Sequence, residues 1–282
     1  MEFKQIVKSL LQFGIIFIIS CESDYCGFFI YNEDVNDRVR QSLTYNATTA
    51  FKILYTPSEQ YTLFIISDSH VGGTHNIRRF LSDANGNNAL ATVLVGDLCN
   101  GHTEEYDTLQ QVLNTDNTIP YFPLIGNHDL FFNGWESFYK IFGSSVYYFS
   151  VQTPSSTDLY VCLDSGSGTH GSIQLQWFEN LLKTSRSKFR HCVVFTHCNL
   201  FRIRRTLSTN PNMEEINIMN DLSARYQIEY VITGHDHIYN EIKLGNTIHI
   251  TLDALSDSAA NASYLELIYR KGSLSHRIIP IN

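Results

Sequence analysis

Short apolar runs recur along the chain and predict its buried strands. The runs are Leu63-Phe64-Ile65-Ile66, Val93-Leu94-Val95, Phe122-Pro123-Leu124-Ile125, Val193-Val194-Phe195 and Tyr230-Val231-Ile232. They are brief and rich in β-branched and aromatic residues, which is typical of buried strands. Helical segments are predicted between them at Ile77–Ser82, Glu104–Asn114, Trp135–Phe142, Ile173–Lys183 and Glu215–Arg225. The alternation of strand and helix predicts an α/β fold.

Other apolar patterns extend this picture on both sides. Three more strands are predicted at Thr247–Leu252, Tyr264–Tyr269 and Arg277–Ile281, and we expect them to finish a second sheet. A strand at Leu159–Leu163 ends in the glycine-rich segment 164–168, which lacks the lysine of a phosphate-binding loop. We interpret this segment as a mobile loop near the functional edge of the sheet.

The segment before the first buried run has a different character. Phe28–Tyr31 is a candidate edge strand, and Val35, Val39 and Leu43 recur at a spacing of four residues. That spacing predicts a helix packed on the outside of the main domain. We therefore divide the chain into residues 1–20, an accessory segment at 21–60 and a main domain at 61–282.

Each of the five buried runs is followed by residues of metal-binding types. The five blocks are Asp68-Ser69-His70, Gly96-Asp97, Gly126-Asn127-His128-Asp129, Thr196-His197 and Gly234-His235-Asp236-His237. Ligands bind beyond the carboxyl ends of strands in open α/β sheets, so we expect all five blocks to meet at one edge of one sheet.

Together the blocks supply a candidate set of metal ligands. The set comprises Asp68, His70, Asp97, Asn127, His197, His235 and His237. Oxygen and imidazole ligands without a thiolate suit Mn, Fe or Zn. Seven side chains exceed the needs of one ion, whereas two ions that share a carboxylate would use them all. Two-metal sites clamp phosphoryl groups and activate water, so the set points to hydrolysis at phosphorus.

In type and order, the blocks resemble the calcineurin-like metallophosphoesterase superfamily. Its signature is D-x-H, G-D, G-N-H-[DE], a lone His after a strand, and G-H-x-H, and the resemblance extends from Asp68 to His237. It implies the metallo-dependent phosphatase fold, a four-layer α/β/β/α sandwich of two mixed sheets flanked by helices. It also implies hydrolysis of phosphate mono- or diesters by a hydroxide that bridges two divalent or trivalent transition metal ions.

The resemblance also implies a role for each block residue. One ion would be held by Asp68, His70 and His237, the other by Asn127, His197 and His235, with Asp97 bridging the two. His128 would act as the general acid or stabilise the transition state. Asp129 would orient His128 through a hydrogen bond, and Asp236 is expected to serve a turn or to support the ligands beside it.

The chain departs from the family pattern at two places. Asn100 stands where purple acid phosphatases have a tyrosine, which argues against the purple ferric subclass. Cys198-Asn199-Leu200 replaces a common proline-containing turn after the lone His. Phe131 and Phe132 follow His128 closely and are either core residues or a platform for a substrate's organic group, such as a nucleobase.

The remaining cysteines and histidines match no signature block. Cys162 and Cys192 lie inside apolar runs and are expected to be buried, free and inert. Cys99 and Cys198 lie close to presumed ligands, where packing is the simpler explanation. Six histidines are interpreted as structural or solvated, with His75 and His170 as outside candidates for the cleft rim; the other four are His102, His191, His249 and His276.

Composition bears on partners and location. The net charge of −8 on 282 residues disfavours long nucleic acids but not a small phosphate ester. A basic start, an apolar stretch to Ile19 and Ser20-Cys21 resemble a lipoprotein signal peptide at 1–20 with Cys21 lipidated. We therefore expect a membrane-anchored lipoprotein of the cell envelope. Ordinary secretion, or a buried N-terminal helix or strand, remains open.

Two function classes remain open at this point. A phosphodiesterase and a phosphomonoesterase would share the same metal core. The alternative is a non-catalytic metal-binding or scaffold lipoprotein of the envelope that retains the fold. The presence of every ligand and of His128 favours the enzyme.

Overall fold

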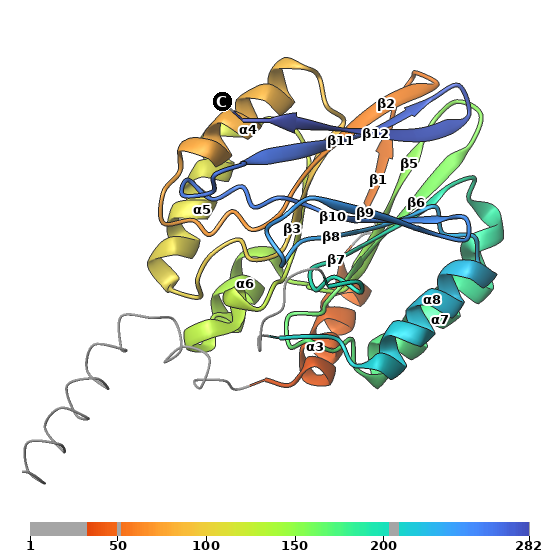
Figure 1. The fold of residues 1–282 in the computed structure, drawn as a ribbon, viewed down its shortest axis with the longest axis horizontal. Helices are drawn as coiled ribbons and strands as arrows, with labels where there is room; N and C mark the ends of the chain where they lie inside the picture. The colour runs from red at the N-terminus through yellow and green to blue at the C-terminus, as the bar shows by residue number, and fades with distance from the viewer. Residues whose placement is uncertain (1–32, 50–51, 203–208, 282) are drawn as a thin grey trace, which may run out of the picture.

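Two mixed β-sheets stack face to face in the computed structural model, with helices on both outer faces (Figure 1). The structure describes residues 33–49, 52–202 and 209–281. The larger sheet runs in the order β1 (Lys52–Tyr55), β5 (Tyr147–Gln152), β6 (Thr157–Leu163), β7 (Cys192–Thr196), β8 (Tyr230–Thr233), β10 (Thr247–Thr251) and β9 (Asn240–Leu244). The smaller sheet runs in the order β12 (Ser273–Pro280), β11 (Ser263–Arg270), β2 (Gln60–Ile66), β3 (Ala91–Val95) and β4 (Tyr121–Leu124).

The central strands of each sheet are parallel, and antiparallel strands lie toward the edges. In the smaller sheet β2, β3 and β4 are parallel, whereas β11 runs antiparallel to β2. In the larger sheet β6, β7, β8 and β10 are parallel. Five strand ends that carry the signature blocks therefore point the same way within their own sheets.

The helices cover the outer faces of the two sheets. They are α3 (Val35–Thr48), α4 (His75–Gly86), α5 (Thr103–Asp116), α6 (Trp135–Phe142), α7 (Ser172–Ser185) and α8 (Met213–Arg225), with short 3-10 turns η2 (His128–Asn133) and η3 (Arg186–Lys188). Apolar faces of α4, α5 and α6 pack on the smaller sheet. Those of α7 and α8 pack on the larger sheet, and α3 packs beside α7.

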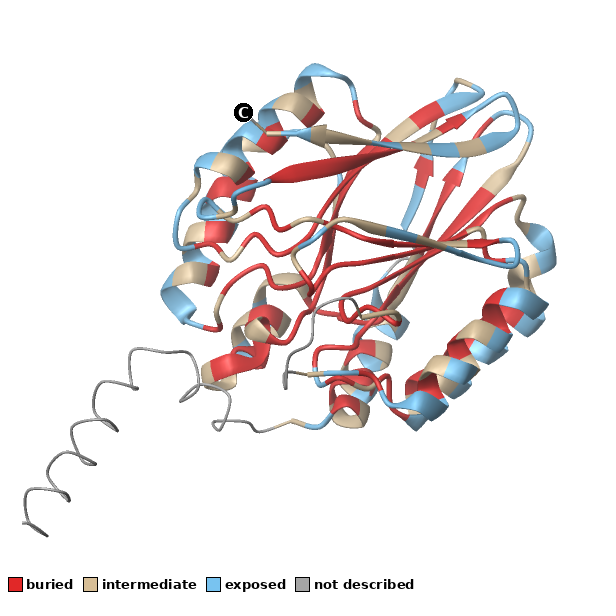
Figure 2. Cartoon of the chain, viewed as in Figure 1, coloured by how far each residue is buried: buried red, intermediate tan, exposed pale blue. Residues whose placement is uncertain are grey.

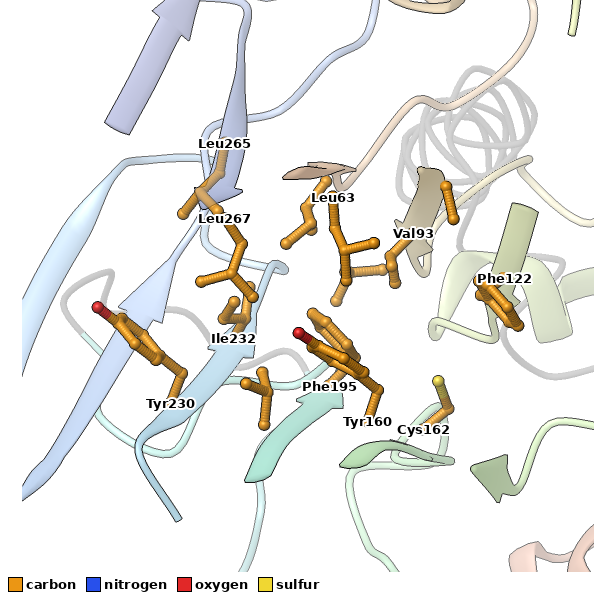
Figure 3. Close-up of a cluster of buried hydrophobic side chains, with 14 of the residues drawn as sticks. Leu63, Val93, Phe122, Tyr160, Cys162, Phe195, Tyr230, Ile232, Leu265 and Leu267 are labelled. Carbon is orange, nitrogen blue, oxygen red and sulfur yellow. The ribbon is translucent and has the colours of Figure 1, made fainter. Parts of the chain in front are cut away.

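The core between the sheets is apolar and closed to solvent. Leu63 and Val93 of the smaller sheet and Phe195 and Ile232 of the larger sheet belong to it, and none has any exposed area (Figure 3). Buried positions dominate the strands, while the helices are exposed on the side away from the sheets (Figure 2). The α/β/β/α sandwich is thus confirmed.

One part of the predicted sheet arrangement is wrong. The five blocks do not lie on one sheet, because β2, β3 and β4 belong to the smaller sheet and β7 and β8 to the larger. Likewise β10 joins the larger sheet, and only β11 and β12 complete the smaller one. An apolar run reports that a strand is buried, but it carries no information about which strands lie next to it.

The accessory segment is described only in part. The predicted helix is present as α3, and β1 adds to the larger sheet by pairing with β5. The predicted signal peptide, Cys21 and the edge strand at Phe28–Tyr31 lie outside the described residues, and the domain boundaries remain predictions. Across the described residues, no helix has the length and apolar character needed to cross a bilayer.

Candidate metal centre

The predicted ligands gather where the carboxyl ends of five strands meet across the two sheets. Asp68 and His70 follow β2, Asp97 follows β3, and Asn127 follows β4. The larger sheet contributes His197 after β7, and His235 and His237 after β8. All seven predicted residues thus come from strand ends.

The backbone turns sharply at most of these ligands. Five of them have positive φ angles although none is glycine: Asp68 (54°), His70 (40°), Asp97 (50°), His235 (74°) and His237 (58°). Non-glycine residues adopt this left-handed conformation rarely, because the Cβ atom crowds the backbone. Such strain clusters at functional sites, where the surrounding structure imposes it.

Two glycines allow the ligand loops to approach one another. A Cβ atom on Gly126 would overlap the backbone N and the carboxylate of Asp97. A Cβ atom on Gly234 would overlap Ser67 Oγ and the carboxylate of Asp68. The glycine in each of these signature blocks is therefore required by the close packing of one ligand loop on another.

The first group of ligand atoms is built from Asp68, His70, Asp97 and His237, all within 4.8 Å of one another. His237 Nε2 lies 3.1 Å from Asp68 Oδ1 and 3.4 Å from His70 Nε2. His70 Nε2 lies 3.9 Å from Asp97 Oδ2. The side chains of His70 and His237 are 13% and 33% exposed, so this side of the centre faces solvent.

The second group is formed by Asp97, His197 and His235, and it shares Asp97 with the first. His197 Nε2 lies 3.2 Å from Asp97 Oδ2 and 4.0 Å from Asp68 Oδ1. Asn127 is buried, and the backbone N–H of the next residue, His128, donates to Asp97 Oδ1 at 2.8 Å. Asp97 is thus common to both groups, and its role as the bridge between two ions stays a prediction.

Hydrogen bonds on the far side of three imidazoles fix which nitrogen faces the centre. His197 Nδ1 lies 2.9 Å from the Val95 carbonyl and His235 Nε2 lies 2.8 Å from the Thr209 carbonyl. A carbonyl only accepts, so each of these nitrogens carries a proton and the other nitrogen of the ring is the one available to a metal ion. His70 Nδ1 lies 2.9 Å from Asn100 Oδ1. This arrangement is typical of metal-ligating histidines.

Buried polar atoms in the centre fit a cation. Asn127 Oδ1 is buried and has no hydrogen-bond partner among the described residues, while Asp97 Oδ2 and His197 Nε2 are buried and face only one another, at 3.2 Å. Leaving such atoms unsatisfied in the interior costs about 1–3 kcal/mol each. Two carboxylates, an amide oxygen and several imidazoles form the donor set that Mn, Fe or Zn prefers. The residues present therefore fit a pair of divalent or trivalent ions.

The ionisable side chains of the centre shift one another's pKa values. Burial alone would raise the pKa of Asp68, but His237 and His197 lower it to about 2. Burial opposes protonation of His197, yet Asp97 and Asp68 raise its pKa to about 10. Burial lowers the pKa of His235 to about 4, so its imidazole is neutral at pH 7. A metal ion at His197 would therefore compete with a proton.

His128 lies beside the centre on its exposed side. Its ring meets the His70 ring edge to face at 4.7 Å between centroids, and the Phe131 ring lies 4.6 Å away. Phe131 is buried and packs against His128, while Phe132 stacks on His102 at 4.2 Å. Phe131 and the half-buried Phe132 thus each have an aromatic partner within the protein, and a platform for a substrate's organic group stays a prediction.

Asp129 connects two ligand loops. Its Oδ1 accepts from the Cys99 N–H at 2.9 Å and its Oδ2 accepts from the Gly126 N–H at 2.8 Å. Burial and the charge of Asp97 raise the pKa of Asp129 to about 7. Asp129 thereby ties the loop after β3 to the loop after β4, and its orientation of His128 remains a prediction.

The sequence did not predict a supporting role for Asn100, whereas it did predict that Asp236 serves a turn or supports its neighbours. Asn100, at the position of the missing tyrosine, accepts a hydrogen bond from His70 Nδ1–H through its Oδ1 and is itself held by Glu105, whose carboxylate accepts from the Asn100 N–H at 2.6 Å. Asp236 is fully buried and accepts from Asn199 Nδ2 at 2.9 Å, and it pairs with Arg202 at 2.7 Å. Asp236 therefore anchors the segment after His197, as a supporting rather than a ligating residue.

The first residues of the segment 164–168 are packed into the protein, which the interpretation as a mobile loop did not anticipate. Asp164 and Ser165 are fully buried and make several hydrogen bonds to neighbouring segments. Glycine and serine content suggested mobility, but the bonds that fix this segment come from residues distant in the sequence.

The cysteines and histidines outside the blocks occupy structural positions. The described cysteines Cys99, Cys162, Cys192 and Cys198 are buried and form no disulfide. Burial raises the pKa of the Cys192 thiol to about 12, which makes it unreactive. His170 is fully buried with Nε2 3.2 Å from Thr196 Oγ1, and His75 is exposed at the start of α4. Neither belongs to the ligand groups found among the described residues.

Comparison with known proteins gives an independent view of the chain. The sequence model described as calcineurin-like phosphoesterase matches residues 61–239. No curated protein matches the chain.

Among solved structures, a dimetal phosphatase from Danio rerio is 13% identical with a TM-score of 0.59, covering 78% of this chain and 98% of that one. The purple acid phosphatase PPD1 from yellow lupin is 16% identical with a TM-score of 0.60, over 79% of this chain and 52% of that one. GAP50, the anchor in the inner membrane complex of Plasmodium, is 11% identical with a TM-score of 0.58, over 79% and 89%. At these identities the structural likeness establishes the fold.

Proposed function

The chain belongs to the calcineurin-like phosphoesterase family, and from that premise we propose that it hydrolyses phosphate mono- or diesters at the centre described above. The observation that carries the proposal is the position of Asp97, which belongs to both groups of ligand atoms. A carboxylate shared between two such groups is the arrangement that a two-metal hydrolase requires.

Two bound ions would supply an activated water and neutralise charge on the phosphoryl group. The chain's own residues supply the rest. His70 and His237 form the partly exposed side of the centre, where an ester approaches. The His128 ring lies at that same side and is positioned to protonate the leaving oxygen or to stabilise developing negative charge.

The hydrogen bond from the His128 backbone N–H to Asp97 Oδ1 links the catalytic candidate to the shared carboxylate. The position of the imidazole is thereby set relative to the ligands by a short backbone contact. Packing against Phe131 restricts the ring further. Preorganisation of this kind supports catalysis, because the group needs no rearrangement during the reaction.

The test is hydrolysis of bis-p-nitrophenyl phosphate and p-nitrophenyl phosphate by the full chain loaded with Mn²⁺, with bound metal counted separately. Preference for the diester would make the protein a phosphodiesterase, and preference for the monoester a phosphatase. Two bound ions without turnover of either ester would favour the alternative, a metal-binding or scaffold protein. Failure to bind Mn²⁺, Fe or Zn would refute the metal centre itself.

We also propose that the protein is attached to the cell-envelope membrane through lipid on Cys21. Support comes only from the basic start, the apolar stretch and Ser20-Cys21. The attachment would be contradicted if a Cys21→Ser variant still partitioned into the detergent phase. It would also be contradicted if mass spectrometry of the mature protein found Cys21 without a lipid.

A further inference from the structure

A fully buried ion pair joins α3 to the segment after β6. The side chains of Arg38 and Asp164 have no exposed area. Arg38 Nε and Nη2 donate to the two oxygens of Asp164, each at 2.9 Å, and Nη1 donates to the Glu33 carbonyl at 2.9 Å. The family match covers residues 61–239, so this contact comes from a helix outside it. Bidentate pairing of this kind fixes the relative orientation of its partners.

The backbone of Asp164 is held from a second direction. Gln174 on α7 is fully buried; its Oε1 accepts from the Asp164 N–H at 2.8 Å and its Nε2 donates to the Asp164 carbonyl at 2.7 Å. Ser145 Oγ donates to Asp164 Oδ2 at 2.9 Å. Contacts from α3, from α7 and from the residue Ser145, which precedes β5, therefore fix Asp164 on three sides.

Ser165, the residue after Asp164, forms hydrogen bonds with both neighbours of the predicted ligand His197. Ser165 Oγ accepts from Thr196 Oγ1 and from the Cys198 N–H, both at 2.8 Å. Cys198 Sγ donates to the Ser165 carbonyl at 3.1 Å. Thr196 and Cys198 are the two neighbours of His197. Ser165 thus makes three hydrogen bonds to the residues on either side of His197, and these bonds fix the backbone from which its imidazole extends.

Gly166 extends the contact to a second ligand loop. A Cβ atom there would lie 2.8 Å from the Gly126 carbonyl and 2.9 Å from Leu130 Cδ1. The segment therefore packs directly against the residue before Asn127. Asn127 and His197 are predicted ligands of the same ion, whereas Asp68, His70 and His237 are predicted ligands of the other.

Stability alone explains the ion pair poorly. Removing two charges from water is costly, and well-packed apolar residues of the same size are often as stabilising or more so. A geometric role is the better-attested use of such pairs. Here the fixed geometry is transmitted to one side of the metal centre.

We propose that Arg38, through Asp164 and Ser165, is a positioning residue for one of the two metal ions, the one assigned to Asn127, His197 and His235. The proposal rests on the proposed metal-dependent function. Supporting residues of this kind change metal affinity about 10–100-fold when they are lost. The effect is selective: the ion at Asp68, His70 and His237 keeps its affinity.

The experiment compares Mn²⁺ binding by the wild-type full chain with that by two variants. Arg38→Met/Asp164→Asn removes both charges while roughly conserving volume, and Ser165→Ala removes only the hydroxyl that bonds to the neighbours of His197. Arg40→Met, an exposed position on the same helix, is the matched control. Electron paramagnetic resonance separates a lone Mn²⁺ from a spin-coupled pair, and thermal unfolding in chelator reports the fold of the metal-free chain.

We expect wild type and Arg40→Met to show the coupled pair at low Mn²⁺. In both test variants the second Mn²⁺ should bind about 10–100-fold more weakly, so that the uncoupled signal dominates at low metal. If Ser165→Ala, or the folded double variant, binds the second Mn²⁺ as tightly as wild type does, the positioning role is overturned. If the double variant does not fold, Ser165→Ala alone decides. A wild-type chain that binds no metal would overturn the proposed function as well.

Discussion

His197 Nε2 lies 3.2 Å from Asp97 Oδ2, although the two residues follow strands of different sheets. His197 comes from the end of β7 in the larger sheet, and Asp97 from the end of β3 in the smaller one. The candidate metal centre therefore lies on the boundary between the two stacked sheets. Its integrity depends on how the sheets pack as well as on the loops themselves.

Replacing Asp97 should abolish binding of both ions. The Asp97→Ala variant loses the one carboxylate common to both ligand groups, so neither retains a full set. Metal analysis after dialysis should find the ions gone, while Asp107→Ala, an exposed position on α5, keeps the wild-type content. Two tightly held ions in Asp97→Ala would show that Asp97 does not bridge.

Replacing His128 should separate catalysis from metal binding. In His128→Ala we expect both ions to remain and turnover to fall about 10²–10⁴-fold, the usual contribution of a general acid. Steady-state kinetics with bound metal counted in the same sample would test this. His276→Ala, near the opposite ends of the strands, serves as the control. Unchanged turnover with the metals in place would remove His128 from the mechanism.

A methyl group at Gly234 should damage the centre. The new Cβ atom would overlap Ser67 Oγ and the Asp68 carboxylate, so the loop after β8 must move away from the loop after β2. We expect Gly234→Ala to weaken Mn²⁺ binding and to destabilise the fold by about 1–3 kcal/mol. Gly86→Ala, where a Cβ atom meets open space, is the comparison for titration and denaturant unfolding. Equal behaviour of the two variants would contradict the close approach.

Acid should weaken the contact between Glu215 and the segment before α7. Burial alone would raise the pKa of Glu215, but hydrogen bonds from His170 and Thr169 lower it from 4.5 to about 2. The carboxylate therefore stabilises the fold above pH 4.5, and this stabilisation is lost as the pH falls toward 2.

Glu215→Gln should accordingly cost about 1–2 kcal/mol at pH 7, after a reduction for solvent screening, and much less near pH 2. Urea unfolding of both proteins across that range measures the difference. A cost that stays constant with pH would mean that the charge of Glu215 contributes nothing.

Much of the architecture was accessible from the sequence, because the relevant signals are local. Leu63-Phe64-Ile65-Ile66 predicts a buried strand from its own composition, and β2 ends at Ile66. The spacing of Val35, Val39 and Leu43 predicts the helix now seen as α3. The ligand blocks were found for the same reason, since each is a short continuous motif at a strand end.

What could not be predicted depends on residues that meet only in the folded chain. Arg38 is a charged residue in an amphipathic helix, and in the sequence it looks like a solvated position. Its burial follows from Asp164, which lies in a segment whose composition suggested mobility. The assignment of β10 to the larger sheet likewise depends on its pairing with β8. Neither the burial of Arg38 nor the pairing of β10 with β8 can be predicted from a short stretch of the sequence.

The division of ligands between the sheets has a consequence for how the protein comes into being. Both carboxylates, Asp68 and Asp97, follow strands of the smaller sheet, whereas the larger sheet contributes only imidazoles. A newly synthesised chain with one sheet formed holds an incomplete set, so the proposed hydrolase is inert until both sheets have docked. The proposed hydrolysis would therefore require that the two sheets have packed together, because neither sheet alone carries all of the predicted ligands.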